Sequence, residues 1–287
     1  MNRLGRTLPA RALLWPSALG VALFYLLPFG LILYYSLVDN AFDQTFVGLD
    51  NYRELLHNAA FLRAAKNTAL FSALAVPGAV GLSLLLSLGL ANKIPGESKF
   101  RTALLSPLTV PVASVVLIWQ ILFHHNGAVN RLLAALGTEG PDWLRSGWGL
   151  LVVALLFWWK NLGYNMVLFT AAVSRIPPEV VEAAKMDGAG PWRLFWRVKW
   201  HYLASTALFV GILSLANSFK VFREVYLLSG NYPSEDLYLL QHYMNNMFRT
   251  LNYPRLSAAA AVMALVIGGV LAVLFFFEGR MERSLEE

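Results

Sequence analysis

Two polar stripes lie inside apolar segments of this sequence. The segment FWWKNLGYNMVLF, residues 157–169, carries four such residues at helical spacings of three and four, Trp158, Asn161, Tyr164 and Asn165. A later segment repeats this spacing with Ser214, Asn217, Ser218 and, one turn further on after Val221, Glu224. These spacings place each set on one helix face. Aromatic rings suit the C–H faces of a sugar, while amides and hydroxyls suit its hydroxyl groups. The stripes predict either a path for a polyhydroxylated solute or hydrogen bonds between helices.

Lys160 lies near the middle of the apolar run, about residues 148–172, that contains the first stripe. A lysine at the centre of an apolar span costs about 3 kcal/mol even on lenient scales, so it should face water or a carboxylate. Glu224 is one candidate partner, but Lys220 and Arg223 lie closer to that acid, and Lys220 has the i, i+4 spacing. The sequence therefore leaves the pair unassigned, and the three cations leave an anionic substrate open.

No residue pattern predicts a catalytic centre. The histidines are scattered among predicted loops and helix ends without a carboxylate spaced to complete a metal site, and no G-x-x-x-x-G-K-[ST] phosphate loop is present. We therefore expect no catalytic residue, metal or cofactor on this chain. Two other classes stay open: a membrane enzyme that uses Lys160 and Glu224, and an ion-coupled carrier, for which an internal repeat is expected but none is found.

The composition predicts an all-α, polytopic membrane protein. Of the 287 residues, 57% are hydrophobic and 14% are charged, and the mean hydropathy of +0.53 exceeds that of ordinary soluble domains. Six apolar runs can each cross roughly 30 Å of hydrocarbon. They cover about residues 12–38, 67–92, 103–123, 148–172, 203–228 and 256–277.

Lysines and arginines in the short loops predict the orientation. If the N-terminus is cytoplasmic, thirteen lie inside: Arg3, Arg6, Arg11, Lys93, Lys99, Arg101, Arg175, Lys185, Arg193, Arg197, Lys199, Arg280 and Arg283. Seven lie outside: Arg53, Arg63, Lys66, Arg131, Arg145, Arg249 and Arg255. This excess places both termini in the cytoplasm. The dispersal of the basic residues argues against nucleic acid as a partner.

The loops are too short for a second domain, so residues 1–287 should form one membrane domain. In the first outer loop, Gly48 permits a turn and Asp50 can cap a short helix in which Glu54 occupies the first turn. The last outer loop, about residues 229–255, combines turn residues with aromatics. It suits an interfacial lid, with or without direct contact to a substrate.

The inner loop at about residues 173–202 predicts two helices joined by a turn. The first helix begins at Pro178 and ends near Met186, where Asp187 and Gly188 break it. A second helix should run from Pro191 to about His201 and lie at the lipid headgroups, because it is basic and rich in tryptophan. Ala183 and Ala184 in the first helix allow close approach by another surface. The chemistry alone supports a docking element and a simple connector equally.

The stretch EAAKMDGAGPWRLFWRVKW, residues 182–200, resembles the cytoplasmic EAA loop of ATP-binding cassette importer permeases. The family pattern is Glu-Ala-Ala, three residues, Gly, nine residues, then Ile-x-Leu-Pro. Glu182, Ala183, Ala184 and Gly188 match it in type and spacing, whereas Trp200 and His201 replace the Leu-Pro ending. The motifs DGA at 187–189, GLDNY at 48–52 and NT at 67–68 look like the carbohydrate-importer branch, the maltose-type permeases.

This resemblance implies a transport subunit of a bacterial or archaeal cytoplasmic (inner) membrane, surrounded by membrane lipid. Two such permeases would pair, and each would insert its loop into one of two cytoplasmic ATP-binding subunits, which hold ATP and Mg²⁺. Glu182 would pair with a basic group there, beside Asp187, and Gly188 would make the turn. An extracytoplasmic solute-binding protein would deliver a carbohydrate substrate or a related solute such as a polyol or glycerol phosphate.

Overall fold

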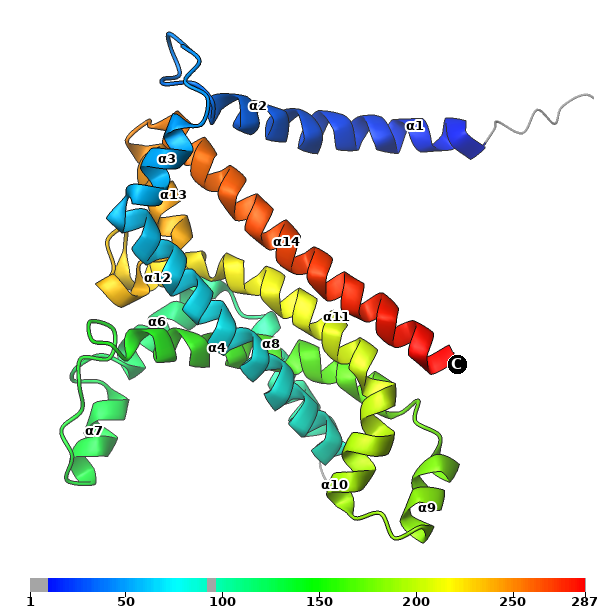
Figure 1. Cartoon of the computed structure of the whole chain (residues 1–287). Coiled ribbons are helices and arrows are strands. Elements are labelled where there is room, and N and C mark those ends of the chain that lie inside the picture. Colours follow the sequence, from blue (N-terminus) through cyan, green and yellow to red (C-terminus); the bar gives the residue numbers. More distant parts are fainter. Residues whose placement is uncertain (1–9, 92–96, 287) are drawn as a thin grey trace, which may run out of the picture. The chain divides into compact units, whose positions relative to one another are not determined.

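The computed structural model describes residues 10–91 and 97–286, which are mainly helical (Figure 1). Within these residues the only extended pairing is an isolated bridge between Val38 and Phe46. The all-α class expected from the composition is therefore confirmed. Several of the basic residues used to predict orientation, Arg3, Arg6 and Lys93 among them, lie outside the described residues.

Five described helices are long and apolar enough to cross a membrane, and a sharply bent pair makes a sixth if it is counted as one span. The five cover Leu14–Tyr35, Ala59–Leu90, Gly149–Val173, Pro191–Ser229 and Tyr253–Arg280. Each contains most of a span expected from hydropathy. The long apolar runs thus become helices, which satisfy every backbone group within the segment.

The third expected span is not one straight helix. Helix α5 (Glu97–Leu105) continues as a 3-10 turn (Ser106–Leu108), and α6 (Val112–Leu122) departs from it at an angle of 100°. Pro111 lies at the break with extended backbone (φ −57°, ψ 136°). A proline disfavours helical backbone in the residue before it and starts a helix well, so it ends one helix and begins the next.

The fifth expected span is longer than predicted. Helix α10 (Pro191–Leu194), a π-helical turn (Phe195–Lys199) and α11 (Trp200–Ser218) follow one another without a loop. A 3-10 turn (Phe219–Val221) and α12 (Phe222–Ser229) complete the run. The prediction of a separate surface helix ending near His201 was therefore wrong. No proline or glycine follows Pro191 until Gly211, so nothing in the sequence stops the helix there.

By their internal contacts the residues form two units. The first comprises Met1–Phe61 and Met244–Ile267. Its helices are α1 (Ala10–Val21), a π-helical turn (Ala22–Leu26), α2 (Leu27–Tyr35) and α3 (Asp50–His57), with the end of α13 (Leu240–Arg249) and the start of α14 (Tyr253–Glu286).

In this first unit, residues of the GLDNY motif join α3 to the end of α2. Gly48 has a positive φ of 62°, as its predicted turn requires. The buried Asn51 donates from Nδ2 to the carbonyl oxygens of Ser36 (3.0 Å) and Val38 (2.7 Å). Asp50 is the first residue of α3 and makes no side-chain cap, contrary to prediction. Part of this motif therefore has a structural role.

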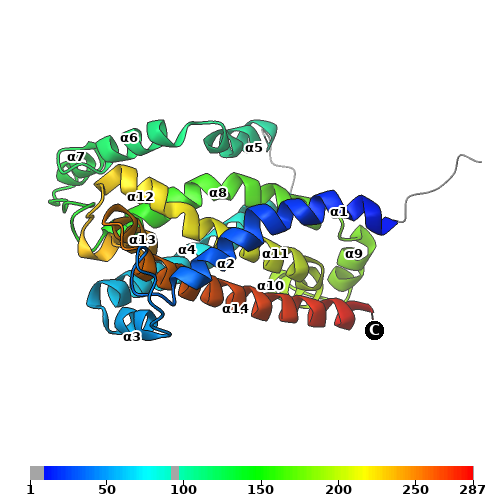
Figure 2. The same cartoon turned by 90° about the horizontal axis from the view of Figure 1, so that it is seen from above.

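The second unit, Leu62–Tyr243 with Gly268–Glu287, contains the remaining elements. Besides those given above, they are α4 (Ala59–Leu90), α7 (Ala128–Ala135), α8 (Gly149–Val173), α9 (Pro178–Met186) and a 3-10 turn (Glu235–Leu237). Helices α5 and α6 lie alongside α8 and α12 (Figure 2).

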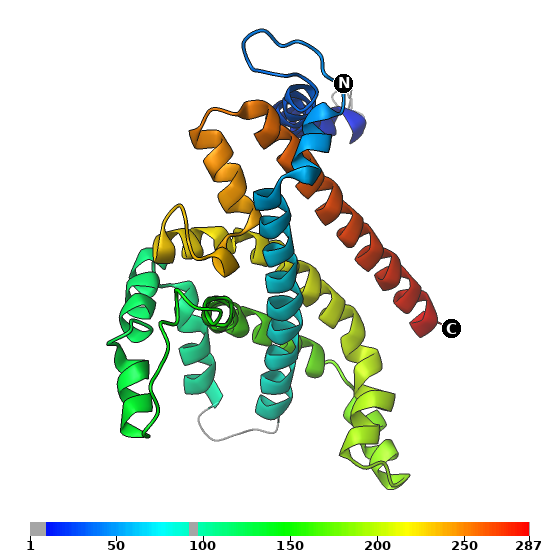
Figure 3. The same cartoon turned by 60° about the vertical axis from the view of Figure 1, so that its left-hand side comes forward.

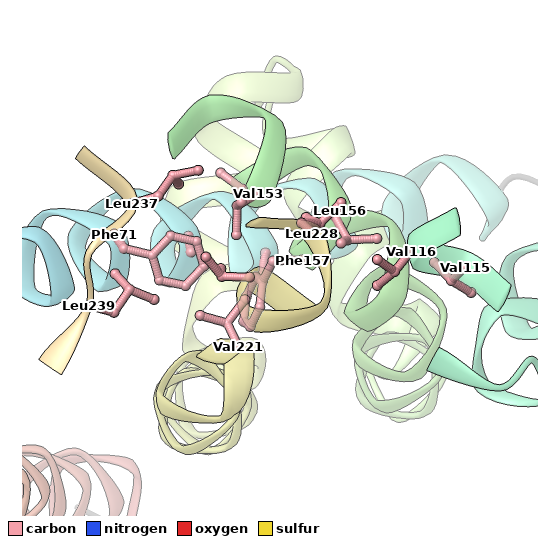
Figure 4. Packing of buried hydrophobic residues seen from close by; sticks show 14 residues of the cluster. Phe71, Val115, Val116, Val153, Leu156, Phe157, Val221, Leu228, Leu237 and Leu239 are labelled. Atoms are coloured by element: carbon pink, nitrogen blue, oxygen red, sulfur yellow. The ribbon is translucent and has the colours of Figure 1, made fainter. Parts of the chain in front are cut away.

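Two apolar clusters form the core of this unit. One gathers buried residues of α4, α6, α8 and α12, where the rings of Phe71 and Phe157 meet edge to face at 5.7 Å between centroids (Figure 4). The other joins α4, α8 and α11 through Leu84, Phe169 and Leu203. The clusters fix α8 against α4 and α11, and so hold the polar stripes in place.

The NT motif fastens the last outer loop to α4. Asn67 donates from Nδ2 to the carbonyl oxygens of Glu235 (2.7 Å) and Tyr238 (3.1 Å), and Thr68 Oγ1 accepts from the Leu240 amide at 2.8 Å. These bonds satisfy backbone groups of a loop that would otherwise lack partners.

Candidate functional site

The side chains of three predicted stripe residues pack between helices and make hydrogen bonds there. Trp158 Nε1 donates to the Ala75 carbonyl oxygen of α4 at 2.9 Å, and its ring fills the space beside Gly78. Asn165, 1% exposed, donates from Nδ2 to Ser214 Oγ at 3.0 Å. The interpretation as helix-to-helix hydrogen bonds therefore describes Trp158, Asn165 and Ser214.

Ser218 has the same kind of environment. Its side chain is 1% exposed, donates from Oγ to the Leu215 carbonyl oxygen at 2.7 Å and lies 3.0 Å from Ser72 Oγ. Tyr164 differs, because 42% of it is exposed. The structure thus separates Tyr164 from the other stripe residues.

The remaining stripe residues surround a cavity of about 210 Å³ in the second unit. It is lined by Leu108, Leu156, Phe157, Lys160, Asn161, Asn217, Lys220, Val221, Arg223 and Glu224. Leu108 comes from the turn between α5 and α6, so the break at Pro111 helps to shape the wall. Nothing in the apolar pattern of that segment identified Leu108.

Two amides form a chain along the cavity wall. Asn161 donates from Nδ2 to the Phe157 carbonyl oxygen at 2.8 Å and accepts at Oδ1 from Asn217 Nδ2 at 3.0 Å. Lys220 Nζ lies 3.5 Å from Asn217 Oδ1. The amides are partly exposed, and Lys220 is exposed. The chain therefore presents polar atoms to a space large enough for a small solute.

Glu224 joins α12 to α8 through an ion pair. Its Oε1 contacts Lys160 Nζ and lies 3.4 Å from a terminal guanidinium nitrogen of Arg223. The Glu224 side chain is 6% exposed and that of Lys160 is 21% exposed. Burying either charge alone is costly, and the pair offsets part of that cost. The question that the sequence left open is resolved in favour of Glu224 as the partner of Lys160.

A second cavity of about 520 Å³ lies between the ends of α6 and α12 and the loops beside them. It is lined by Gln120, Phe123, His124, His125, Asp142, Leu144, Arg145, Leu228, Ser229, Tyr232, Pro233 and Ser234. Gln120 Nε2 donates to the carbonyl oxygens of Leu227 and Leu228 at 3.1 and 3.0 Å. No pattern in the sequence indicates this cavity, because its residues are scattered over helix ends and several loops.

Helix α9 and the turn after it form an exposed projection. In Figures 1 and 3, α9 and α10 extend together beyond the end of α11. Val181 packs on the cluster that contains Leu203, whereas Glu182 and Ala183 are exposed. One side of α9 is thus anchored, and the side that carries Glu182 and Ala183 is open, whereas Ala184 is half-buried. Among the described residues, no group of histidine, aspartate and glutamate could hold a metal ion.

Gly188 makes the turn that follows α9. Its φ is +77°, and its amide donates to the Lys185 carbonyl oxygen at 3.0 Å. This left-handed conformation favours glycine because a Cβ would strain it. Asp187, just before it, is exposed.

Trp200, which replaces the leucine of the family ending, has a structural explanation. It packs against the Leu203 cluster, and its ring centroid lies 6.1 Å from that of Phe195 and 5.4 Å from that of Trp196. An aromatic cluster therefore holds the start of the long helix where the family pattern has Leu-Pro.

Residues 83–286 match the family described as "Binding-protein-dependent transport system inner membrane component". The chain belongs to this family of ATP-binding cassette importer permeases. It is thus a multi-pass transport component of an inner membrane, and transport by its family depends on a binding protein.

Relatives agree with this assignment. The sn-glycerol-3-phosphate transport system permease protein UgpA of Yersinia enterocolitica is 30% identical over 281 residues, which are 94% of each chain. The probable ABC transporter permease protein YurN of Bacillus subtilis is 27% identical over 252 residues, 84% of this chain and 85% of that protein. A bacterial ABC transporter involved in alginate import has the same fold, with a TM-score of 0.78 and 23% identity over 96% of each chain.

Proposed function

We propose that this chain forms half of the translocation pathway of an ATP-driven importer for a carbohydrate or a related polyhydroxylated solute such as glycerol phosphate. A second, homologous permease supplies the other half. Two cytoplasmic subunits bind ATP and Mg²⁺ and hydrolyse ATP, because this chain has no phosphate loop of its own. A binding protein outside the membrane delivers the solute. The names of the relatives and the polar cavity support this range of substrates.

The observation that carries the proposal is the one-sided anchoring of α9. Its inner side packs on the core of the second unit, while Glu182 and Ala183 are exposed on the other side. A nine-residue helix such as α9 is too short to be stable in water by itself, so a partner surface must cover the open side or the core must hold the helix. In a helix docked to an ATPase, the core holds the inner side and the ATPase covers the open side.

The same docking assigns roles to the motif residues. Glu182 pairs with a basic group of the ATPase, Ala183 and Ala184 permit close approach of the two backbones, and Gly188 with Asp187 fixes the turn. Closure of the ATPases around ATP tilts the docked helices and switches the pathway from outward-facing to inward-facing. In this arrangement α9 and both termini are cytoplasmic.

A charge reversal tests the docking. Glu182→Lys, introduced into the assembled importer, should abolish ATP-driven uptake and release the ATPase, while the chain still reaches the membrane. Glu179→Lys is the matched control, since Glu179 is an exposed acid in the first turn of the same helix. It should retain the ATPase and most of the uptake. Normal uptake by Glu182→Lys with the ATPase still bound would overturn the proposal.

The absence of cysteine permits a separate test of topology. A single cysteine at Lys185 should react with a membrane-impermeant maleimide only in inside-out vesicles. A single cysteine at Glu139, in the loop before α8, should react only in right-side-out vesicles. The opposite pattern would contradict cytoplasmic termini.

A further inference from the structure

Four ionisable side chains line the same cavity, and their charges do not cancel. Lys160, Lys220 and Arg223 contribute three positive charges and Glu224 contributes one negative charge, which leaves a net charge of +2. A cavity meant for a neutral sugar has no need of this excess, because each additional charge inside a membrane is costly.

The ion pair accounts for only one of the three cations. Glu224 Oε1 contacts Lys160 Nζ, and both side chains are largely buried. Arg223 reaches the same oxygen atom at 3.4 Å with one nitrogen, and its side chain is 63% exposed. The pair thus leaves most of the guanidinium of Arg223 available to another group.

Lys220 has no carboxylate partner among the residues that the structure describes. Its Nζ makes a long contact, 3.5 Å, with Asn217 Oδ1. Lys220 and Arg223 both lie towards the end of the candidate span Pro191–Ser229, where exposed charges favour water or a second protein over hydrocarbon. Because both line the cavity, the aqueous pathway is the environment that suits them.

We propose that this cavity selects anionic solutes, namely phosphorylated or carboxylated polyols and sugars, and that Lys220 and Arg223 are the specificity-determining residues. This inference rests on the proposed function and narrows its substrate class. The guanidinium of Arg223 can donate two parallel hydrogen bonds to a phosphate or carboxylate, and Lys220 adds a compact charge. Asn161 and Asn217, on the same wall, face the hydroxyl groups of the solute.

The Lys160–Glu224 pair has a positioning role in this scheme. Glu224 holds Arg223 near the cavity and neutralises Lys160. The excess positive charge therefore lies on Lys220, in the turn at 219–221, and on Arg223, in the first turn of α12. An anion that entered would be attracted there and not to the buried lysine.

The test uses the membrane complex of both permeases and the ATPases in lipid nanodiscs, without ATP or binding protein. Saturation-transfer NMR would measure the binding of two matched probe pairs: sn-glycerol 3-phosphate against glycerol, and galacturonate against galactose. At least one anion should bind about tenfold more tightly than its neutral counterpart. The first pair tests a phosphate ester and the second a carboxylate.

Variants assign the preference to residues. Lys220→Gln and Arg223→Gln should each reduce the affinity for the preferred anion by about threefold to tenfold and leave the neutral probe unaffected. Lys220→Arg should retain the preference. Lys66→Gln, the same change at an exposed lysine of α4 outside the cavity, should behave as the unchanged complex does. Co-elution with the ATPase shows that each variant has folded.

Two results would overturn the inference: no preference for either anion in the unchanged complex, or a preference that survives in the Lys220→Gln/Arg223→Gln double variant. Hydrolysis of ATP by the same preparation separates these from a failure of the proposed function. A complex that hydrolyses ATP but shows no anion preference refutes only the selectivity. A chain that neither co-elutes with an ATPase nor supports hydrolysis refutes both.

Discussion

The polar stripes of α8 and α11 meet at two levels, and the same residue types behave differently at each. At one level Asn165 and Ser214 are buried and bond to each other. One turn along α8, Asn161 and Asn217 also bond to each other, but they line a cavity beside charged groups. A polar side chain in a membrane span is therefore not by itself a mark of a substrate path. The space and the charges around it distinguish a packing contact from a candidate binding group.

The largest effect is expected where the two kinds of environment meet, at Glu224. Glu224→Ala leaves Lys160 largely buried without its counter-charge, and should lower the stability of the complex by about 3 kcal/mol. Thermal unfolding in detergent would measure the loss. Adding Lys160→Met should restore part of it, because the unpaired charge is then gone. Additive losses in the double variant would show that the pair is not coupled.

Lowering the pH tests a buried polar residue outside the candidate spans, His242. His242 in α13 is fully buried, and burial lowers its pKa from 6.5 to about 4. Since its pKa is higher in the unfolded chain, the unfolded state binds more protons between these values, and stability falls as the pH drops from 6.5 towards 4. At pH 5 the loss should be about 2 kcal/mol.

The comparison of His242→Phe with the unchanged protein, by thermal unfolding at pH 7 and pH 5, isolates this contribution. The variant should lose less stability on acidification, while His57→Gln, at an exposed histidine, should lose as much as the unchanged protein. Equal acid sensitivity in all three would assign the effect to other groups.

Trp158 is the aromatic example of a stripe residue that packs between helices, and a conservative substitution tests this role. Trp158→Phe keeps most of the ring but loses the hydrogen bond to the Ala75 carbonyl oxygen, so stability should fall by about 1 kcal/mol. The KM for transport should stay unchanged. A raised KM at unchanged stability would instead make Trp158 part of the substrate path.

The smallest expected effect comes from a direct comparison of the buried amide Asn165 with the cavity amide Asn161. Asn165→Ala should cost about 0.6 kcal/mol of stability, the average for a hydrogen bond between membrane helices, with little change in KM. Asn161→Ala should mainly raise the KM, because its partner Asn217 already lies on the cavity. Uptake kinetics together with thermal unfolding of both variants would show whether the two levels differ as described.

Hydropathy was sufficient for most of the fold. Long apolar runs have few alternatives to a helix in lipid, so the positions of the spans followed from length and composition. Hydropathy does not encode direction, however, and it does not distinguish the bent pair at Pro111 from a straight span. The segment from Pro191 to Lys199 is basic and aromatic, so its polarity suggested a surface helix although its backbone continues into the membrane.

The site was only partly predictable for a related reason. Helical spacing placed the right residues on common faces, but it could not identify what lies opposite each face. Trp158 meets a carbonyl of α4, and Lys160 meets an acid 64 residues later in the chain. Both contacts depend on how helices cross, which a single sequence does not state. The glycine turn at 188 was predictable because its cause is local.

The long fifth helix has a mechanical consequence. Between Pro191 and Asn217 no loop interrupts the chain, and at about 1.5 Å per residue this stretch is roughly 40 Å long. One end adjoins α9, and the other carries an amide of the cavity. In the proposed importer this stretch acts as a lever: a small rotation at the ATPase becomes a displacement of several ångströms at Asn217, without a separate hinge to transmit it.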